Sequence, residues 1–429
     1  MKNAPVIAVG IAFASLSVFA QESLSREQSV QRALEGNRDL VAARVKVEEA
    51  KARLQQAGLW PNPELEVGNL LGNPVTSAGE YALAATVSQP FSISGRIAAR
   101  KGLARVDIER TLAGVAELER GVVGEVRRAF TTYFAVEEQI KLQLFLIGLN
   151  EELLGATKVA LERAQVSEKD VNAILIASQQ ARQRLEVLKT QRRSRSIELN
   201  KLMGQPPDRD FLVAGELELQ PPPEPSTLSL DQVLTRRPDF AAAQLDVALA
   251  RSEQQLAKAE RIDDWRIGAG YELDKSVIDG APRQAADQFL GLKLTIPLPW
   301  FDRKQGRLRE TVALEDRAQK TAEALRIRIA QEVADSLNRA NTLAPLLASY
   351  QGGLLKRAED NVTLVENGYR QGLTGIVEVI QSRQQFAELK ASYIDTLREY
   401  DEAVVDLELA AGIFPSTIQL SQPTEVNTP

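Results

Sequence analysis

The stretch QFLGLKLTIPLPWFDRKQGRL (residues 288–308) joins a strand pattern directly to a helix pattern. Leucine or isoleucine occupies every second position from Leu290 to Ile296, which is typical of a strand with one apolar face. Pro297 and Pro299 should end the strand because proline cannot donate to a β-ladder. Helical periodicity then continues over 303–371. At about 1.5 Å per residue, a helix of that length would span roughly 105 Å, far more than a globular domain.

The same junction occurs earlier in the chain, where ATVSQPFSISGRIAARKGL (85–103) leads into a second long helical pattern. The segments 37–68 and 237–268 also share eight of 32 positions when aligned at an offset of 200. We therefore expect an internal repeat, 21–225 and 226–429, with helix, two strands, long helix and shorter helix in each half. The expected helices are 26–58, 96–165, 171–203, 229–261, 303–371 and 376–411. The expected strands are 63–72, 81–91, 265–273 and 288–297. They form two strand pairs, within about 63–91 and 265–297, which are the barrel strands considered next.

Each expected strand has about nine residues, with one apolar face and one face of small or polar residues, as transmembrane β-barrel strands do. Packing of these strands on a soluble core is the alternative. Four strands cannot close a barrel, and open edges are costly in lipid, so several copies would have to share one barrel. Two copies would give a filled bore and three an aqueous passage; composition leaves both open. The charged residues expected in the barrel lumen are Glu64, Glu66, Arg266, Glu272 and Lys293.

The helices carry apolar residues three or four positions apart, for example from Leu112 to Tyr133 and from Phe386 to Ala411. A repeat of this kind indicates coiled-coil packing. In each half, the two shorter helices together nearly match the long one, so they can lie end to end and antiparallel along it. The alternative, a rod-like structural coiled coil, would have the same apolar repeat along its helices but would need no strands.

Composition excludes several classes of protein. The net charge of −6 argues against nucleic-acid binding, which depends on basic surfaces. The chain contains neither histidine nor cysteine, so a Ser-His-Asp or Cys-His nucleophile, an imidazole metal site and a disulfide cannot form. We expect no enzyme, no cofactor and no metal site. Residues 1–20 read as a secretory signal peptide, which places the mature chain outside the cytoplasm.

Four motifs carry a family resemblance. They are NRDLVAARVKVEEAKARL with AGLWPNPEL, QPFSISGR, IPLPWFDRKQGRL, and the long segment from Tyr369 to Leu407 followed by Gly412. In this order they resemble the TolC-type outer-membrane efflux channel family, and PLPWFDRKQG is most like its heavy-metal cation (CzcC-like) branch.

The resemblance implies a mainly α-helical protein with a membrane β-barrel. A homotrimer would form a twelve-stranded barrel in outer-membrane lipid and an α-helical coiled-coil tunnel across the periplasm. The partners implied are a periplasmic membrane-fusion adaptor and an inner-membrane pump of the resistance-nodulation-division class. Passive export of heavy-metal cations is the implied function. Multidrug or small-molecule efflux, type I secretion and a periplasmic structural coiled coil are the alternatives.

The family pattern also assigns roles to two helix breaks, 164–173 and 368–380, expected about 100 Å from the barrel by the helix-length estimate. The expected adaptor contacts there are Val166, Ser167, Leu373, Thr374 and Gly375. The expected periplasmic constriction residues are Asp170, Tyr369 and Glu378. Thr374 and Gln381 depart from the charged residues of well-known members, so the gate is expected to be held differently or more loosely. Capping of a helix N-terminus is the alternative role for the acids.

Overall fold

The computed structural model describes residues 23–71, 80–213, 221–222, 228–277, 280, 282 and 284–418. The expected signal peptide (1–20), most of the first strand–strand loop (73–79) and much of the linker near 225 lie outside these residues. The chain forms two compact units, each built from both halves of the sequence. Unit 1 comprises Met1–Glu35, Glu125–Leu219 and Leu346–Asp401, and unit 2 comprises Gly36–Gly124, Gln220–Pro345 and Glu402–Pro429. The expected boundary between repeats near residue 225 stays a prediction.

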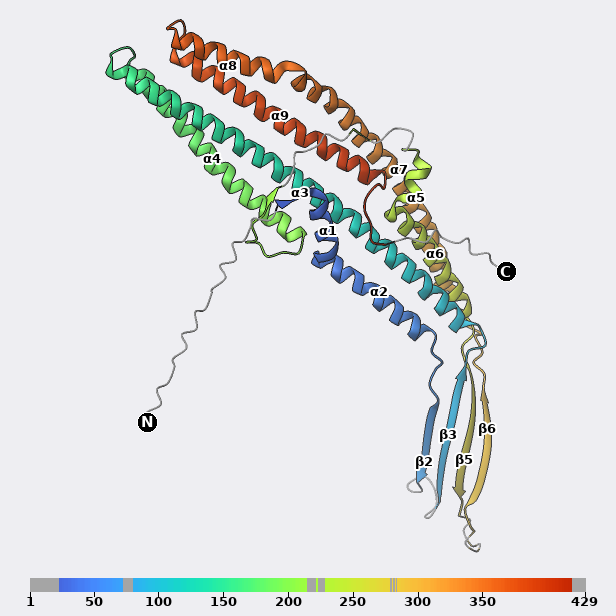
Figure 1. Cartoon of the computed structure of the whole chain (residues 1–429). Coiled ribbons are helices and arrows are strands. Elements are labelled where there is room, and N and C mark those ends of the chain that lie inside the picture. Colours follow the sequence, from blue (N-terminus) through green and yellow to red (C-terminus); the bar gives the residue numbers. More distant parts are fainter. Residues whose placement is uncertain are drawn as a thin grey trace, which may run out of the picture. The chain divides into compact units, whose positions relative to one another are not determined.

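A four-stranded antiparallel sheet dominates one part of unit 2 (Figure 1). Its strands follow the order β2-β3-β5-β6, so β2 and β6 form the two edges. The strands are β2 (Glu64–Leu71), β3 (Tyr81–Phe91), β5 (Trp265–Lys275) and β6 (Asp287–Thr295). The helices α2 (Arg38–Ala57), α5 (Leu230–Arg236) and α6 (Pro238–Ala259) belong to this unit, together with parts of α3 (Arg96–Glu162) and most of α7 (Gln305–Ser349).

The register of the sheet separates two faces. Leu65 pairs with Val87, Val87 with Ala269, and Ala269 with Leu292, so these apolar residues share one face. This face is open to solvent in the single chain; Leu292, for example, is 89% exposed. An apolar face without a covering layer is what a lipid-facing sheet requires.

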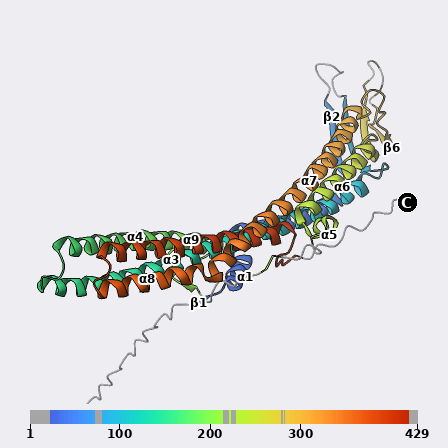
Figure 2. The same ribbon diagram turned by 90° about the horizontal axis from the view of Figure 1, so that it is seen from above.

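In unit 1, two helical hairpins end at the same end of the unit (Figure 2). The first consists of α3 and α4 (Glu168–Leu202), and the second of α8 (Leu355–Arg370) and α9 (Ile376–Ala410). The first hairpin buries a cluster of Val136, Ile140, Ile147, Ala181, Leu185 and Leu188. A second cluster joins α3 to the other hairpin and consists of Ala135, Leu142, Leu146, Val362, Phe386 and Ile394.

The remaining elements of unit 1 are a short helix and a two-stranded sheet. Helix α1 (Arg26–Gly36) follows the short strand β1 (Ser23–Leu24), which pairs in parallel with β4 (Leu212–Val213). Asp401 on α9 accepts hydrogen bonds from Arg26 at 2.8 Å and from Thr131 at 2.5 Å. These contacts tie α1 to α3 and α9.

The structure differs from the sequence-based expectation at three helix breaks. The expected helix 26–58 is divided at Asn37, whose side chain caps α2 by accepting from the amides of Asp39 and Leu40. The expected helix 229–261 is divided at Arg237, which precedes Pro238 and takes an extended conformation. The expected long helix 303–371 is also wrong as a continuous α-helix, because a π-turn over Tyr350–Leu354 separates α7 from α8. Within the described ranges, every helix is too short or too polar to cross a bilayer.

Candidate functional site

The turn between α3 and α4 is closed by a hydrogen-bonded cap at Ser167. The carboxylate of Asp170 accepts from the Ser167 amide at 3.0 Å and from the Ser167 hydroxyl at 2.7 Å. These hydrogen bonds, the amide first, hold the pKa of Asp170 below its usual range. Ala164 adopts a φ of 57°, which lets the chain reverse direction before the cap. Asp170 therefore does have the capping role that was the alternative to a constriction role. Its side chain remains half-buried near the tip.

The turn between α8 and α9 is built differently. Gly372 adopts a φ of 74°, and the Leu373 amide donates to the Gly368 carbonyl at 2.8 Å, as in a glycine-terminated helix. The Leu373 side chain is 76% exposed, which makes it the most prominent apolar residue of this tip. The Thr374 hydroxyl donates to the carbonyl of Val365 at 3.0 Å, so this residue holds the turn against α8.

Glu378 occupies the same helical position as Asp170, because each is the third residue of the helix that follows its turn. Its carboxylate folds over the start of α9, where a Cβ on Gly375 would lie 2.6 Å from it. Gly375 therefore gives the carboxylate room to approach the helix N-terminus, which attracts negative charge. The side chain of Glu378 is exposed. The structure thus brings both predicted acids to the same end of unit 1, one on each hairpin.

Tyr369 lies on the last turn of α8 and lines a hollow of about 100 Å³ between α3, α8 and α9. Leu149 and Val379 line the same hollow. The predicted aromatic residue therefore faces the seam between the hairpins in the single chain. Its role at a constriction stays a prediction, as do the adaptor contacts at both tips.

The polar face of the sheet holds the five charged residues expected in a lumen. Glu64, Ser88, Gly268 and Lys293 stand in one cross-strand row. Glu66 lies in the next row, and Arg266 reaches back to within 3.8 Å of Glu64. Glu272 shares this face and lies one row beyond Glu66, where it pairs with Phe289. A small hollow of about 70 Å³ lies over the rows of Glu64 and Glu66 and over the row in which Arg266 pairs with Thr295.

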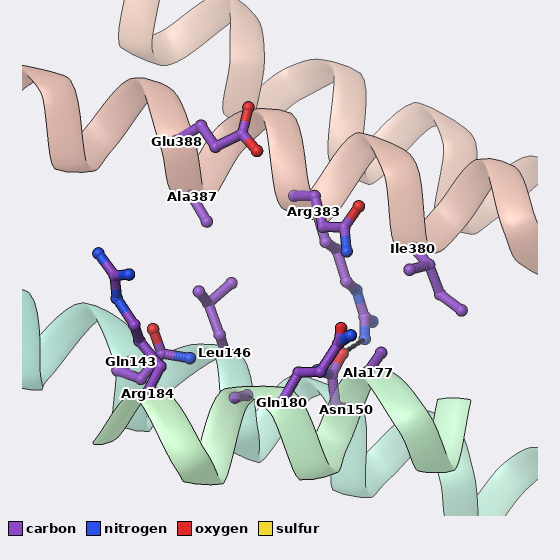
Figure 3. Close-up of a pocket in the computed structure, with 12 residues that line it drawn as sticks. Gln143, Leu146, Asn150, Ala177, Gln180, Arg184, Ile380, Arg383, Ala387 and Glu388 are labelled. Carbon is purple, nitrogen blue, oxygen red and sulfur yellow. Dashed lines mark hydrogen bonds between the residues drawn. The ribbon is translucent and has the colours of Figure 1, made fainter. Parts of the chain in front are cut away.

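Sequence reasoning missed Arg383, which lies between the hairpins (Figure 3). Its side chain is 8% exposed, forms an ion pair with Glu366 at 2.7 Å and donates to the Leu149 carbonyl at 2.9 Å. The same nitrogen, Nη1, also donates to the side-chain oxygen of Asn150 at 3.1 Å. Nothing in the surrounding sequence marks this arginine as a buried one. Among the described residues, no group of three or more Asp or Glu side chains is placed to hold a metal ion.

Comparison with known proteins identifies the family. A family model described as "Outer membrane efflux protein" matches residues 29–205 and 229–413. The cobalt-zinc-cadmium resistance protein CzcC of Cupriavidus metallidurans is 22% identical over 408 residues, covering 92% of each chain. The pyoverdine export outer membrane protein OpmQ of Pseudomonas aeruginosa is 26% identical over 409 residues, covering 89% of this chain and 81% of the relative.

A solved structure of CusC, whose description names transmembrane channel formation, has the same fold with a TM-score of 0.75 at 17% identity. The superposition covers 90% of this chain and 91% of that one. The TolC-like fold expected from the motifs is confirmed, and so is the family resemblance on which it was based. The chain belongs to the outer membrane efflux protein family.

Proposed function

We propose that three copies of this chain form one passive channel through the outer membrane. The observation that carries this proposal is the open sheet: among the described residues, β2 and β6 are both edges with a strand on one side only. They run antiparallel to each other, because three successive antiparallel pairings separate them. The β6 edge of one copy can therefore pair with the β2 edge of the next and continue the same pattern.

Three copies suit a channel better than two. An unpaired backbone group costs several kcal/mol in lipid, so the edges must be closed in either case. Eight strands would give a bore filled by side chains, whereas twelve leave room for an aqueous passage. The polar face bearing Glu64, Glu66, Arg266, Glu272 and Lys293 would then line the passage, with the apolar face toward lipid.

We infer that the helical part extends into the periplasm and connects to an export pump. The supporting feature is the pair of hairpin tips with exposed or half-exposed residues suited to contact: Val166, Ser167, Leu373, Thr374 and Gly375. In this arrangement a membrane-fusion adaptor meets the tips and joins the channel to an inner-membrane pump of the resistance-nodulation-division class. The channel itself supplies a route, and energy comes from the pump.

Heavy-metal cations are the proposed cargo. Likeness to CzcC, whose name refers to cobalt, zinc and cadmium resistance, supports this assignment. The acids at the hairpin tips support it as well, because three copies of Asp170 and Glu378 around a narrow axis would favour cations. Export of a small organic molecule is the second candidate, supported by the likeness to a pyoverdine export protein.

Replacing Asp170 and Glu378 with alanine should widen the tip and remove its negative charge. We expect higher single-channel conductance in a planar bilayer and a reversal potential shifted toward equal cation and anion permeability. The matched control is Glu359→Ala, which removes an exposed acid from α8, away from the turn. If conductance and selectivity both stay at wild-type values in the double variant, the gate assignment is wrong.

A further inference from the structure

The guanidinium of Arg383 connects three helices of unit 1. Its Nε and Nη2 atoms contact Glu366 Oε1 on α8 at 2.8 and 2.7 Å. Its Nη1 atom donates to the Leu149 carbonyl and to Asn150 Oδ1, both on α3. A planar guanidinium can hold these partners at once, whereas a lysine ammonium lacks the fixed fork of donors.

The contacts of Arg383 divide between the two hairpins. Glu366 belongs to the same hairpin as Arg383, so this ion pair fixes the orientation of the arginine on the α8–α9 side. Leu149 and Asn150 belong to the α3–α4 hairpin, so the other donors cross from one hairpin to the other. We call this set, Arg383 with Glu366, Leu149 and Asn150, the interhairpin clip.

A hollow of about 370 Å³ adjoins the clip between α3, α4 and α9, lined by polar side chains that include Gln143 and Gln180 and by apolar ones such as Leu146 and Ile380 (Figure 3). The smaller hollow that holds Tyr369 also reaches Arg383. The clip is a polar link between α9 and α3 that adjoins the apolar cluster containing Leu146 and Phe386, on the tip side of that cluster.

We propose that Arg383 is a positioning residue that holds the α8–α9 hairpin against α3 and thereby sets the width of the passage at the tip. The proposal rests on the proposed channel function. Tyr369 and Glu378 lie on the hairpin that the clip holds, on either side of the turn. Loss of the clip would leave the buried Asn150 without this donor and would free the tip to move away from α3.

The first test replaces Arg383 with glutamine. We expect single-channel conductance in a planar bilayer to rise several-fold, while the oligomer keeps its size and heat resistance in a detergent gel. The matched control is Arg182→Gln, because Arg182 is 57% exposed and pairs with Glu151 at 2.6 Å within the α3–α4 hairpin. Conductance of that control should equal the wild-type value.

A covalent bridge distinguishes positioning from general damage. The chain contains no cysteine, so the double variant Arg383→Cys/Asn150→Cys introduces two unique thiols. A reducible bifunctional thiol reagent about as long as an arginine side chain should return the raised conductance to the wild-type value, and reduction should raise it again.

Three outcomes separate the proposals. If the wild type conducts and Arg383→Gln has the same conductance, the clip is overturned and the channel function is not. The same holds if cross-linking leaves the conductance of the double variant unchanged. A wild-type chain that conducts no ions in any bilayer overturns the channel function on which the clip depends.

Discussion

Replacing Arg237 with methionine is expected to destabilise unit 2 by about 3–5 kcal/mol, the usual cost of removing one partner from a buried ion pair. The Arg237 side chain is 1% exposed and contacts Asp239 at 2.5 Å and Glu332 at 2.8 Å. It also donates to the Ala410 carbonyl at 3.1 Å, which is one of the last carbonyls of α9. Methionine fills a similar volume but removes the closest cation of Asp239, leaving only Arg120 at 4.0 Å to offset its charge among the described residues. The measurement is the Tm of the protein in detergent, determined by circular dichroism.

Two further variants test this explanation. Arg251→Met removes an arginine that is 60% exposed and pairs with Glu315, so its effect should stay within about 1 kcal/mol. The double variant Arg237→Met/Asp239→Leu removes both charges and should recover much of the lost stability, because an apolar pair can replace a buried ion pair. A double variant as unstable as the single one would show that the charge left on Asp239 is not the cause.

The same pair predicts a pH dependence. Burial opposes the charge on Asp239, but hydrogen bonds and charge from Arg237 outweigh it and hold the pKa of Asp239 below its usual range. A carboxyl group with a lowered pKa stabilises the fold above its unfolded pKa, about 4, and this contribution is lost as pH falls through the folded value. The difference between the wild type and Arg237→Met should therefore be largest near neutral pH and should shrink below about pH 4.

The second large effect is expected for Leu292→Arg. Leu292 lies in the middle of β6 on the apolar face, opposite Ala269. If this face meets lipid, an arginine near the bilayer midplane costs about 2–4 kcal/mol. We expect a large loss of heat-modifiable oligomer in the outer-membrane fraction, measured on a detergent gel with and without boiling.

Gly291→Arg provides the matched control for Leu292→Arg. Gly291 is the adjacent residue of the same strand but lies on the polar face, and a Cβ there meets no atom within 4 Å. An arginine at this position should reach the aqueous passage and should leave the oligomer abundant. Equal assembly of the two variants would contradict a lipid-facing role for the apolar face.

Local periodicity predicted much of this fold. The period-two pattern from Leu290 to Ile296 fixed which side chains share a face, because alternation in a strand depends on the backbone alone. Both helical hairpins were foreseen from the breaks at 164–173 and 368–380. The break at Asn37 could also have been predicted, since asparagine followed by Arg-Asp is an ordinary N-cap sequence.

Other features depend on contacts between distant parts of the chain. Arg383 donates to the carbonyl of Leu149, which lies 234 residues away in sequence. Its burial therefore cannot be predicted from its neighbours along the chain. Arg237 likewise contacts Ala410 from 173 residues away. The π-turn at Tyr350–Leu354 requires Gly353 to adopt a φ of 114°, whereas a glycine inside a helical pattern is often tolerated without any break. Local sequence patterns therefore do not predict the burial of Arg383, the burial of Arg237 or the π-turn.

The most direct test of the account is the mass of the mature protein purified in a mild detergent, determined by native mass spectrometry. A sheet with two open antiparallel edges must be completed by other copies if it lies in lipid. We predict one assembly of three chains, stable until the detergent is exchanged for a denaturing one. A monomer that stays soluble without detergent would contradict the shared barrel and, with it, the channel.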